Sequence, residues 1–374
     1  MKRSFSFIAA GTLLIAATYG LVRLAYGLYL PDMQATLGFD DGAAGLISSG
    51  GSLVYCAGAL VGVATATRFP RALVAAAGLT AATGSLGMAL ASGTALLAAA
   101  AVLSSAGAGL ASPALVETVR RSVPAADRDR AQTLVNSGTG PGLIAAGILA
   151  LALLPHWRAG WWVAAGVSLC GALAVLTTSR SRRSAGSRVD LLPVQWLRTH
   201  RAPMIAALLL GAGSAAVWSF GRNLLDSAGS TSTLAWIALG VGGTLVLPTA
   251  PLIVRLRVGH AWALTTGSVA VSTLVLPLLV DHLPLALLAC TLFGWGYTAA
   301  TGVLITWTGR LDPNRAATGT AVLFVLLVLG QAIGAAAVGA LMTSSTVAFT
   351  AAGLTAALST CLAATAPQPS RQAT

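Results

Sequence analysis

The chain alternates long apolar stretches with short polar ones along almost its whole length. Twelve of the apolar stretches reach the length of about 20 residues that a helix needs to cross a membrane. They run near residues 6–29, 43–66, 72–91, 94–118, 130–154, 160–178, 203–225, 232–254, 261–280, 284–307, 316–341 and 345–365. Since a backbone in hydrocarbon must satisfy its own hydrogen bonds, spans of this kind are helices. The pattern predicts an all-α membrane protein with 12 transmembrane helices.

The composition agrees with this prediction. The sequence is 56% hydrophobic and only 9% charged, whereas about a quarter of the residues of a soluble domain are charged. The start Met-Lys-Arg before an apolar run resembles a secretory signal, but the run is too long and contains Arg23, so we expect a retained first span. The four cysteines lie within spans at wide spacing, and the four histidines lie between spans. We therefore expect no disulfide framework, no metal site and no cofactor.

The positive charges fall almost entirely on one side of the predicted spans. All but three of the 22 lysines and arginines lie in alternate connecting segments or at the termini, and the exceptions are Arg23, Arg222 and Arg158 in an outer loop. Cytoplasmic loops carry such an excess, so both termini are predicted to be cytoplasmic. The net charge of +12 is explained by this orientation and needs no nucleic-acid partner. One lysine against many arginines indicates a GC-rich bacterial genome, which places the protein in a bacterial inner (cytoplasmic) membrane.

Two arginines lie inside spans. Arg23 ends the run 17–23 and Arg222 ends the run 216–222, with an aromatic residue four positions earlier in each, Tyr19 and Trp218. An arginine at membrane depth costs several kcal/mol unless it is paired or faces water. With the predicted span boundaries, both arginines lie in the outer third of the membrane.

The two arginines also mark an internal repeat. Residues 179–202 form a basic cytoplasmic linker between a six-span bundle at 1–178 and a second at 203–366, followed by a tail at 367–374. Arg130 and Arg315 end matching loops after spans 4 and 10. Two parallel repeats of six spans are the layout of many secondary transporters.

This layout resembles the major facilitator superfamily over essentially the whole chain. The loop after span 2 is similar to the signature loop of that family, with Gly62 and the gating residues Arg68 and Arg71 present, but Ala66 replaces the aspartate that braces the cytoplasmic gate. Span 4 has Gly107-Ala108-Gly109, with Leu103 where the family commonly has arginine. The second departure argues against proton coupling through span 4.

Span 5 is closer to a family pattern. Its stretch 138–142, Gly-Thr-Gly-Pro-Gly, resembles the Gly-Pro motif of exporters in the superfamily, with Gly140 and Pro141 at its centre. Proline kinks a helix and glycine allows a neighbour to approach closely, although both are frequent in membrane helices generally. Residues 23–27 before Pro31, together with Gly330-Gln331, resemble the YbfB/YjiJ-type branch.

The family resemblance implies that spans 1, 4, 7 and 10 line a central cavity. Tyr19, Arg23 and Tyr26 recur at helical spacing and share a face of span 1. The other candidate substrate-binding residues are Arg222 and Trp218 in span 7, Trp295 and Tyr297 in span 10, and Asn136 in span 5.

Two interpretations of the arginines remain open. In the first, they grip one anion from opposite halves, because a guanidinium offers a planar fork of donors to carboxylate or phosphate. In the second, Arg222 pairs with Asp226 and Arg23 with an outer acid such as Asp32, which makes an outer gate. Asp226 is also the candidate proton carrier.

Remaining residues have simpler interpretations. Glu117 and Arg120 at the inner end of span 4 are expected to pair in a cytoplasmic salt-bridge lattice, and Trp157, Trp161 and Trp162 to lie in the interfacial aromatic belt.

The sequence thus predicts a secondary active transporter that works by alternating access, in proton-coupled export of a small organic molecule such as an organic anion. Uptake by the same fold is an alternative, and a non-transporting membrane sensor or assembly subunit is an alternative of another class. A monomer in the lipid bilayer is expected, with a small-molecule substrate and a proton as partners. The protein is not expected to be an enzyme, since no cluster of catalytic residues is present in the sequence.

Overall fold

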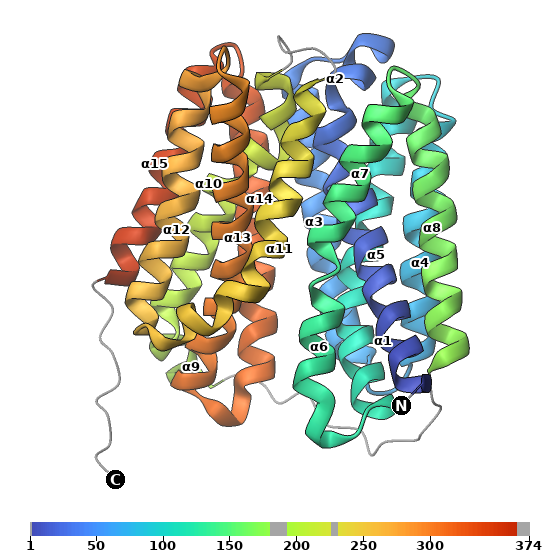
Figure 1. The fold of residues 1–374 in the computed structure, drawn as a ribbon, viewed down its shortest axis with the longest axis vertical. Helices are drawn as coiled ribbons and strands as arrows, with labels where there is room; N and C mark the ends of the chain where they lie inside the picture. Colours follow the sequence, from blue (N-terminus) through green and yellow to red (C-terminus); the bar gives the residue numbers. More distant parts are fainter. Residues whose placement is uncertain (1, 180–192, 226–230, 365–374) are drawn as a thin grey trace.

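The computed structural model describes residues 2–179, 193–225 and 231–364. Within these ranges the chain is helical, and 12 helices are long and apolar enough to cross a membrane. Figure 1 shows two bundles standing side by side, one built from the blue-to-green first half and the other from the yellow-to-red second half. We call the end at which α1 and α10 begin the inner end, and the opposite end the outer end.

The first bundle holds six spans, of which the first and fifth are made of several segments. They are α1 (Lys2–Ile15), η1 (Ala16–Arg23) and α2 (Ala25–Leu37); α3 (Asp41–Thr65); α4 (Pro70–Ala89); α5 (Thr94–Ser122); η2 (Ala125–Asp127), α6 (Arg128–Asn136) and α7 (Thr139–Leu153); and α8 (Trp157–Thr178).

The second bundle follows a short helix that precedes its first span. Its elements are α9 (Val194–Thr199); α10 (Arg201–Leu224); α11 (Leu234–Arg255); α12 (Val258–Val275) with η4 (Leu276–Leu279); α13 (Leu283–Leu311); η5 (Pro313–Arg315) with α14 (Ala316–Leu341); and α15 (Ser345–Ala364).

The first span is longer than the sequence pattern predicts. It runs from Phe5 to Leu37, because Pro31 is accommodated inside α2 and the chain leaves the helix only at Gly38, whose φ of 70° suits a glycine cap. Its middle is a π-helix, in which the Leu24 amide donates to the carbonyl of Tyr19, five residues back. Such π segments are uncommon and concentrate at functional sites.

The fifth span is interrupted, as the proline in its motif leads one to expect. Pro141 has no N–H to donate and its ring crowds the carbonyl four residues earlier. The helix accordingly breaks at Ser137 and Gly138, between α6 and α7.

Small residues let the spans meet closely. A Cβ on Gly20 would lie 2.5 Å from the backbone of Gly142, and one on Gly140 would lie 2.6 Å from Oγ1 of Thr244. The glycines of the span 5 motif therefore bring span 5 against span 1 in its own half and against α11 in the other half, which is the packing that small residues permit in membranes.

Two tryptophans expected in the aromatic belt are instead buried. Trp161 is fully enclosed and packs against Tyr29 with ring centroids 5.3 Å apart, while Trp157 donates its indole N–H to Oγ1 of Thr36 at 3.0 Å. Trp162 is 51% exposed. The belt prediction was wrong for the first two because span 1 extends far enough outward to cover them.

The end of the predicted linker packs on the second bundle. His200, fully buried, stacks on the ring of Trp196 in α9 at 3.8 Å and lies 3.1 Å from Oγ1 of Thr308 in α13. Burial lowers the pKa of His200 below its ordinary value, which the carbonyl of Trp196 partly offsets. The α9 segment is thus fixed to the inner end of the second half.

Candidate functional site

A cavity lies between the two bundles near the middle of the spans. The residues around it leave about 560 Å³ of empty space, part of it open to the surroundings. Spans 1, 2, 3, 4, 7 and 11 contribute to its walls. The lining predicted for spans 1, 4 and 7 is present, but span 10, which was also predicted to line the cavity, contributes none of the described lining residues. The lining residues are Val22, Arg23, Leu24, Tyr26, Gly27, Ile47, Ser48, Gly51, Ser52, Met88, Ala101, Ser104, Ser105, Ala215, Trp218, Ser219 and Gln331.

Arg23 is the one charged residue in this lining. Its guanidinium donates to Oε1 of Gln331 at 2.7 Å, lies 3.5 Å from Oγ of Ser52, and sits 4.7 Å from the centre of the Tyr55 ring. These partners are all neutral. Within the described ranges, no carboxylate reaches salt-bridge distance of Arg23.

Arg23 lies deeper than the sequence suggested. Ser52 is the twelfth of the 25 residues of α3, and Gln331 is the sixteenth of the 26 of α14, so the guanidinium stands at mid-span. The placement in the outer third was wrong because the predicted span 1 ended at residue 29, several residues before Leu37.

Gln331 links Arg23 to the second half of the chain. It accepts from Arg23 through Oε1 and donates through Nε2 to the Tyr297 hydroxyl at 2.9 Å. Tyr297 stacks on Phe293 and meets the edge of Trp218, whose ring centre is 5.3 Å away. The indole N–H of Trp218 is buried and has no hydrogen-bond partner among the described residues. Side chains from spans 1, 7, 10 and 11 thus contact one another at a similar depth along the spans.

Tyr19 and Tyr26 support this site from the first half. The Tyr19 hydroxyl is 2.8 Å from that of Tyr55, so Tyr19 holds the ring that Arg23 covers. Tyr26 lines the cavity and donates to the carbonyl of Ala44 at 3.2 Å. Tyr19 lies within the π-helix and packs against the Tyr55 ring, with ring centroids 5.9 Å apart, and it is not among the residues that line the cavity.

Arg222 has a different place from its symmetry mate. It is 4% exposed and forms a salt bridge with Asp32, and its NH1 also donates to the Leu28 carbonyl at 2.6 Å. Both acceptors belong to the outer part of span 1. The expected partner of Arg23 is therefore the partner of Arg222, because span 1 extends past Arg23 and carries Asp32 to the end of α10. Asp226 lies outside the described residues.

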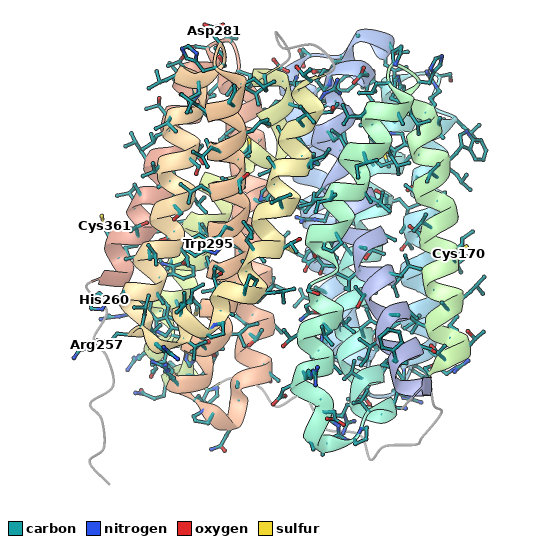
Figure 2. All side chains as sticks on the ribbon, viewed as in Figure 1. Cys170, Arg257, His260, Asp281, Trp295 and Cys361 are labelled. Carbon is teal, nitrogen blue, oxygen red and sulfur yellow. The ribbon has the colours of Figure 1, made fainter. Side chains whose placement is uncertain are left out.

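The remaining predicted substrate contacts lie elsewhere. Trp295 points its indole N–H at Oγ1 of Thr249 in α11, at 2.9 Å, and Figure 2 shows it within the second bundle. Asn136 is exposed on α6 and accepts from Gln132. The structure thus brings together Arg23, Tyr19, Tyr26, Trp218 and Tyr297, and leaves Trp295, Asn136 and Arg222 outside that group.

The gating candidates at the inner end make local contacts. Arg71 donates to Oγ of Ser179 at 3.0 Å, and Arg68 lies over the ring of Phe69. Glu117 pairs with Arg120 and Arg121, as the sequence predicts for the first of these, and Arg121 also donates to the carbonyl of Thr67. This contact braces the loop after span 2, where Ala66 has replaced the family aspartate.

Sequence reasoning missed three groups around Arg23. Gln331 appeared only as part of a branch motif, and Ser52 and Tyr55 in span 2 were not considered. A glutamine inside an apolar span is itself a signal, since an amide is costly in hydrocarbon unless it finds partners. Its distance of 308 residues from Arg23 along the chain explains why the pairing could not be predicted.

Two bundles of membrane-length helices with a cavity between them indicate a multi-pass membrane protein. The sequence profile of the Major Facilitator Superfamily matches residues 12–335, and this chain belongs to that superfamily. Membership of this superfamily makes the chain a secondary transporter and not an enzyme.

Several solved transporters share the fold. The nucleoside transporter NupG superposes with a TM-score of 0.77 at 15% identity, covering 97% of this chain and 98% of that one. The peptide transporter POT gives 0.77 at 16%, covering 97% and 93%. A bacterial homolog of the human lysosomal transporter Spinster, in an inward-facing and unoccupied conformation, gives 0.73 at 15%, covering 97% of both chains. The search of curated proteins finds no match. At these identities the likeness concerns the fold alone.

Proposed function

We propose that this chain exports a small organic anion by alternating access, with Arg23 as the group that binds the anion and the proton gradient as the driving force. The observation that carries the proposal is the position of Arg23. A guanidinium faces the cavity at mid-span, and its described partners are neutral. A charge at this depth is expensive without a counterion, and a substrate anion would supply one.

The geometry around Arg23 favours a ligand with one anionic group. Gln331 occupies part of the guanidinium through a single neutral oxygen at 2.7 Å. A carboxylate or phosphate would replace that oxygen with a bidentate, charge-assisted contact, which is stronger than a neutral hydrogen bond. Trp218 and Tyr26 offer aromatic walls for the rest of the molecule.

Export is favoured over uptake by the span 5 motif. Gly140 packs on Thr244 of α11 and Gly147 packs on Ile237, so the exporter-like motif lies on the contact between the two halves. A rocking motion of the halves must change this contact. Uptake through the same cavity remains the second candidate. We further propose a cytoplasmic membrane location with both termini inside and a monomeric transport unit.

The test is ligand-induced stabilisation of the purified protein. A panel of monocarboxylates and organic phosphates, with lipophilic cations for comparison, is screened for a rise in the thermal unfolding midpoint, because ligands that prefer the native state raise it. We expect stabilisation by one or more anions. In Arg23→Gln the affinity should fall about 10- to 100-fold, the loss expected for a charge-assisted hydrogen bond.

Arg257→Gln is the matched control. This arginine is exposed at the inner end of the second bundle, where Figure 2 shows it pointing away from the molecule. It should bind the anion as the wild type does. Equal affinity in the Arg23 variant, or stabilisation by cations alone, would remove the anion proposal.

A further inference from the structure

A second cavity lies on the side of the second bundle, away from the Arg23 site. It is walled by the inner halves of α11 and α13 and by the start of α12, and it leaves about 470 Å³ of empty space, part of it open to the surroundings. Figure 1 shows these three helices side by side, with α13 between the other two. We call this cavity the side pocket. Its lining residues are Val246, Ala250, Ile253, Val254, Leu256, Val258, Ala261, Ala299, Gly302, Val303, Thr306 and Arg310.

The side pocket opens toward the lipid. In the outer half of α13, Leu285, Leu288 and Leu292 are exposed and follow one another at helical spacing, so they form the stripe of this helix that faces hydrocarbon. Tyr297 of the Arg23 site lies on the opposite face of α13. The exposed stripe continues inward through four residues that line the side pocket, at positions 299, 302, 306 and 310. The side pocket therefore belongs to the lipid-facing surface and not to the transport cavity.

The walls of the side pocket are apolar except near its inner end. Every lining residue other than Thr306 and Arg310 is apolar, and the Thr306 hydroxyl already donates to the carbonyl of Gly302 at 3.1 Å. A water molecule in a cavity needs two or more polar partners, and these walls offer few. The side pocket is therefore suited to hydrocarbon.

The side chains of the protein do not fill this space. A Cβ added at Gly302 would meet no neighbouring atom within 4 Å. Across the side pocket, α11 carries Pro248 and Pro251 beside its lining residues, and proline removes a backbone hydrogen bond and bends a helix. Trp295 nevertheless ties α13 to α11, because its indole N–H donates to Oγ1 of Thr249 at 2.9 Å. A gap therefore persists between two helices that are otherwise held together.

Two arginines stand at the inner end of the side pocket. Arg310 lines it and is the next-to-last residue of α13, and Arg255 ends α11 between two lining residues. Both are exposed, and within the described ranges neither forms an ion pair. Asp312, the acid nearest to Arg310 along the chain, pairs with Arg315. Since the ends of membrane spans lie at the depth of the lipid head groups, these two charges are available to a head group.

We propose that an anionic phospholipid of the leaflet at the inner end occupies the side pocket, with an acyl chain along the apolar walls and its phosphate on the Arg310 guanidinium. Arginine binds phosphate through two parallel hydrogen bonds, and basic pockets between membrane helices on the cytoplasmic side suit anionic head groups. Arg255 adds a second positive charge beside the phosphate. This site shares no lining residue with the Arg23 site and goes beyond the proposed transport function.

Lipid titration of the purified protein tests the proposal. The protein in neutral detergent receives phosphatidylglycerol or phosphatidylcholine, which has no net charge, and the thermal unfolding midpoint is followed because a ligand of the native state raises it. Native mass spectrometry of the same samples counts the lipids that stay bound. We expect phosphatidylglycerol to act at about 5- to 10-fold lower concentration than phosphatidylcholine, the size expected for one or two arginines near a head group.

Two variants remove the two parts of the site. Arg310→Gln removes the phosphate contact and should abolish the preference for phosphatidylglycerol, and Gly302→Leu fills the gap and should retain fewer bound lipids than the wild type. Arg257→Gln and Gly166→Leu are the matched controls and should behave as the wild type. Arg257 points away from the molecule at the same end (Figure 2), and Gly166 is an equally open glycine in the first bundle.

Wild-type preference and wild-type lipid retention in both Arg310→Gln and Gly302→Leu would overturn the proposal, as would equal action of the two lipids on the wild-type protein. Arg310→Gln changes an exposed side chain, so it keeps the test decisive if Gly302→Leu does not fold. Arg23→Gln should keep the lipid preference, which separates this site from the transport site. In that variant, a midpoint rise with glycerol phosphate at the concentrations at which phosphatidylglycerol acts would show a site for soluble anions instead of lipid.

Discussion

Arg23 and Arg222 show how the same residue acquires different surroundings in two repeats. Each lies 21 residues after the first residue of its helix, Lys2 or Arg201. Arg23 is enclosed by neutral hydroxyl, amide and aromatic groups at mid-span, whereas Arg222 meets a carboxylate at the outer end. The sequence left two alternatives for both arginines, binding of one anion from opposite halves or formation of an outer gate. We assign the first role to Arg23 and the second to Arg222.

Gln331→Glu gives the sharpest test of the Arg23 site at this scale. A carboxylate would stand where the amide oxygen now lies, 2.7 Å from the guanidinium, and would act as an internal counterion. We expect anion-induced stabilisation to disappear while the ligand-free unfolding midpoint stays the same or rises. Gln331→Leu should instead lower the midpoint, because Arg23 and Tyr297 both lose a partner. Anion binding that survives Gln331→Glu would contradict the assignment.

His200 predicts a pH dependence of stability. Its pKa is lowered by burial in the folded protein, so the unfolded chain takes up a proton at a higher pH than the folded chain does. Stability should therefore be constant above about pH 7.5 and fall as the pH decreases through the ordinary histidine pKa of about 6.5. Thermal midpoints from pH 8 to pH 5 measure this.

Two histidine variants serve as the comparison. His200→Gln should have a lower midpoint at pH 8 but a smaller decline toward pH 5. His260→Gln, at an exposed position, should keep the wild-type decline. A decline of wild-type size in His200→Gln would assign the effect to other groups.

At the scale of elements, most of the spans were predictable and their interruptions were not. Hydropathy alone located all 12 helices, since a membrane span is a strong signal. The π-helix in span 1 leaves no trace in composition, and the predicted span ended at residue 29, whereas the helix continues through Pro31 and stops at Gly38. Both errors concern backbone hydrogen bonding, which depends on neighbouring helices and not on the local sequence alone.

Gly27 tests the contact between α2 and α10. A Cβ at this position would collide with the carbonyl of Trp218, so Gly27→Ala should oppose outer closure. We expect a cysteine placed at Ser219, which lines the cavity, to react faster in this variant with a membrane-impermeant maleimide added from the outer side, with a nearly unchanged folded yield. Gly166→Ala is the control, because nothing lies within 4 Å of the added carbon, and it should leave labelling unchanged. Labelling at the wild-type rate in Gly27→Ala would show that this close contact does not control outer closure.

At the scale of the whole molecule, the halves are joined mainly at the outer end and at mid-span. The pairs Arg222–Asp32 and Asn223–Gln34 join them at the outer end. The pairs Ser48–Ser219, Trp236–Leu24 and Arg23–Gln331 join them around the cavity. The two-bundle layout was predictable from the repeat and the linker. The pairing of Arg23 with Gln331 was not, because it crosses between halves and depends on how they are closed.

The central claim is that Arg23 binds the transported anion, and flux through proteoliposomes tests it most directly. Vesicles are loaded with an anion that stabilises the wild-type protein, and its release is followed under an imposed pH gradient for the wild type, Arg23→Gln and Arg257→Gln. We predict rapid release by the wild type and Arg257→Gln, and release by Arg23→Gln slowed about 10- to 100-fold at anion concentrations below the wild-type Kd, in line with its weaker binding. Release by Arg23→Gln at the wild-type rate would contradict the account.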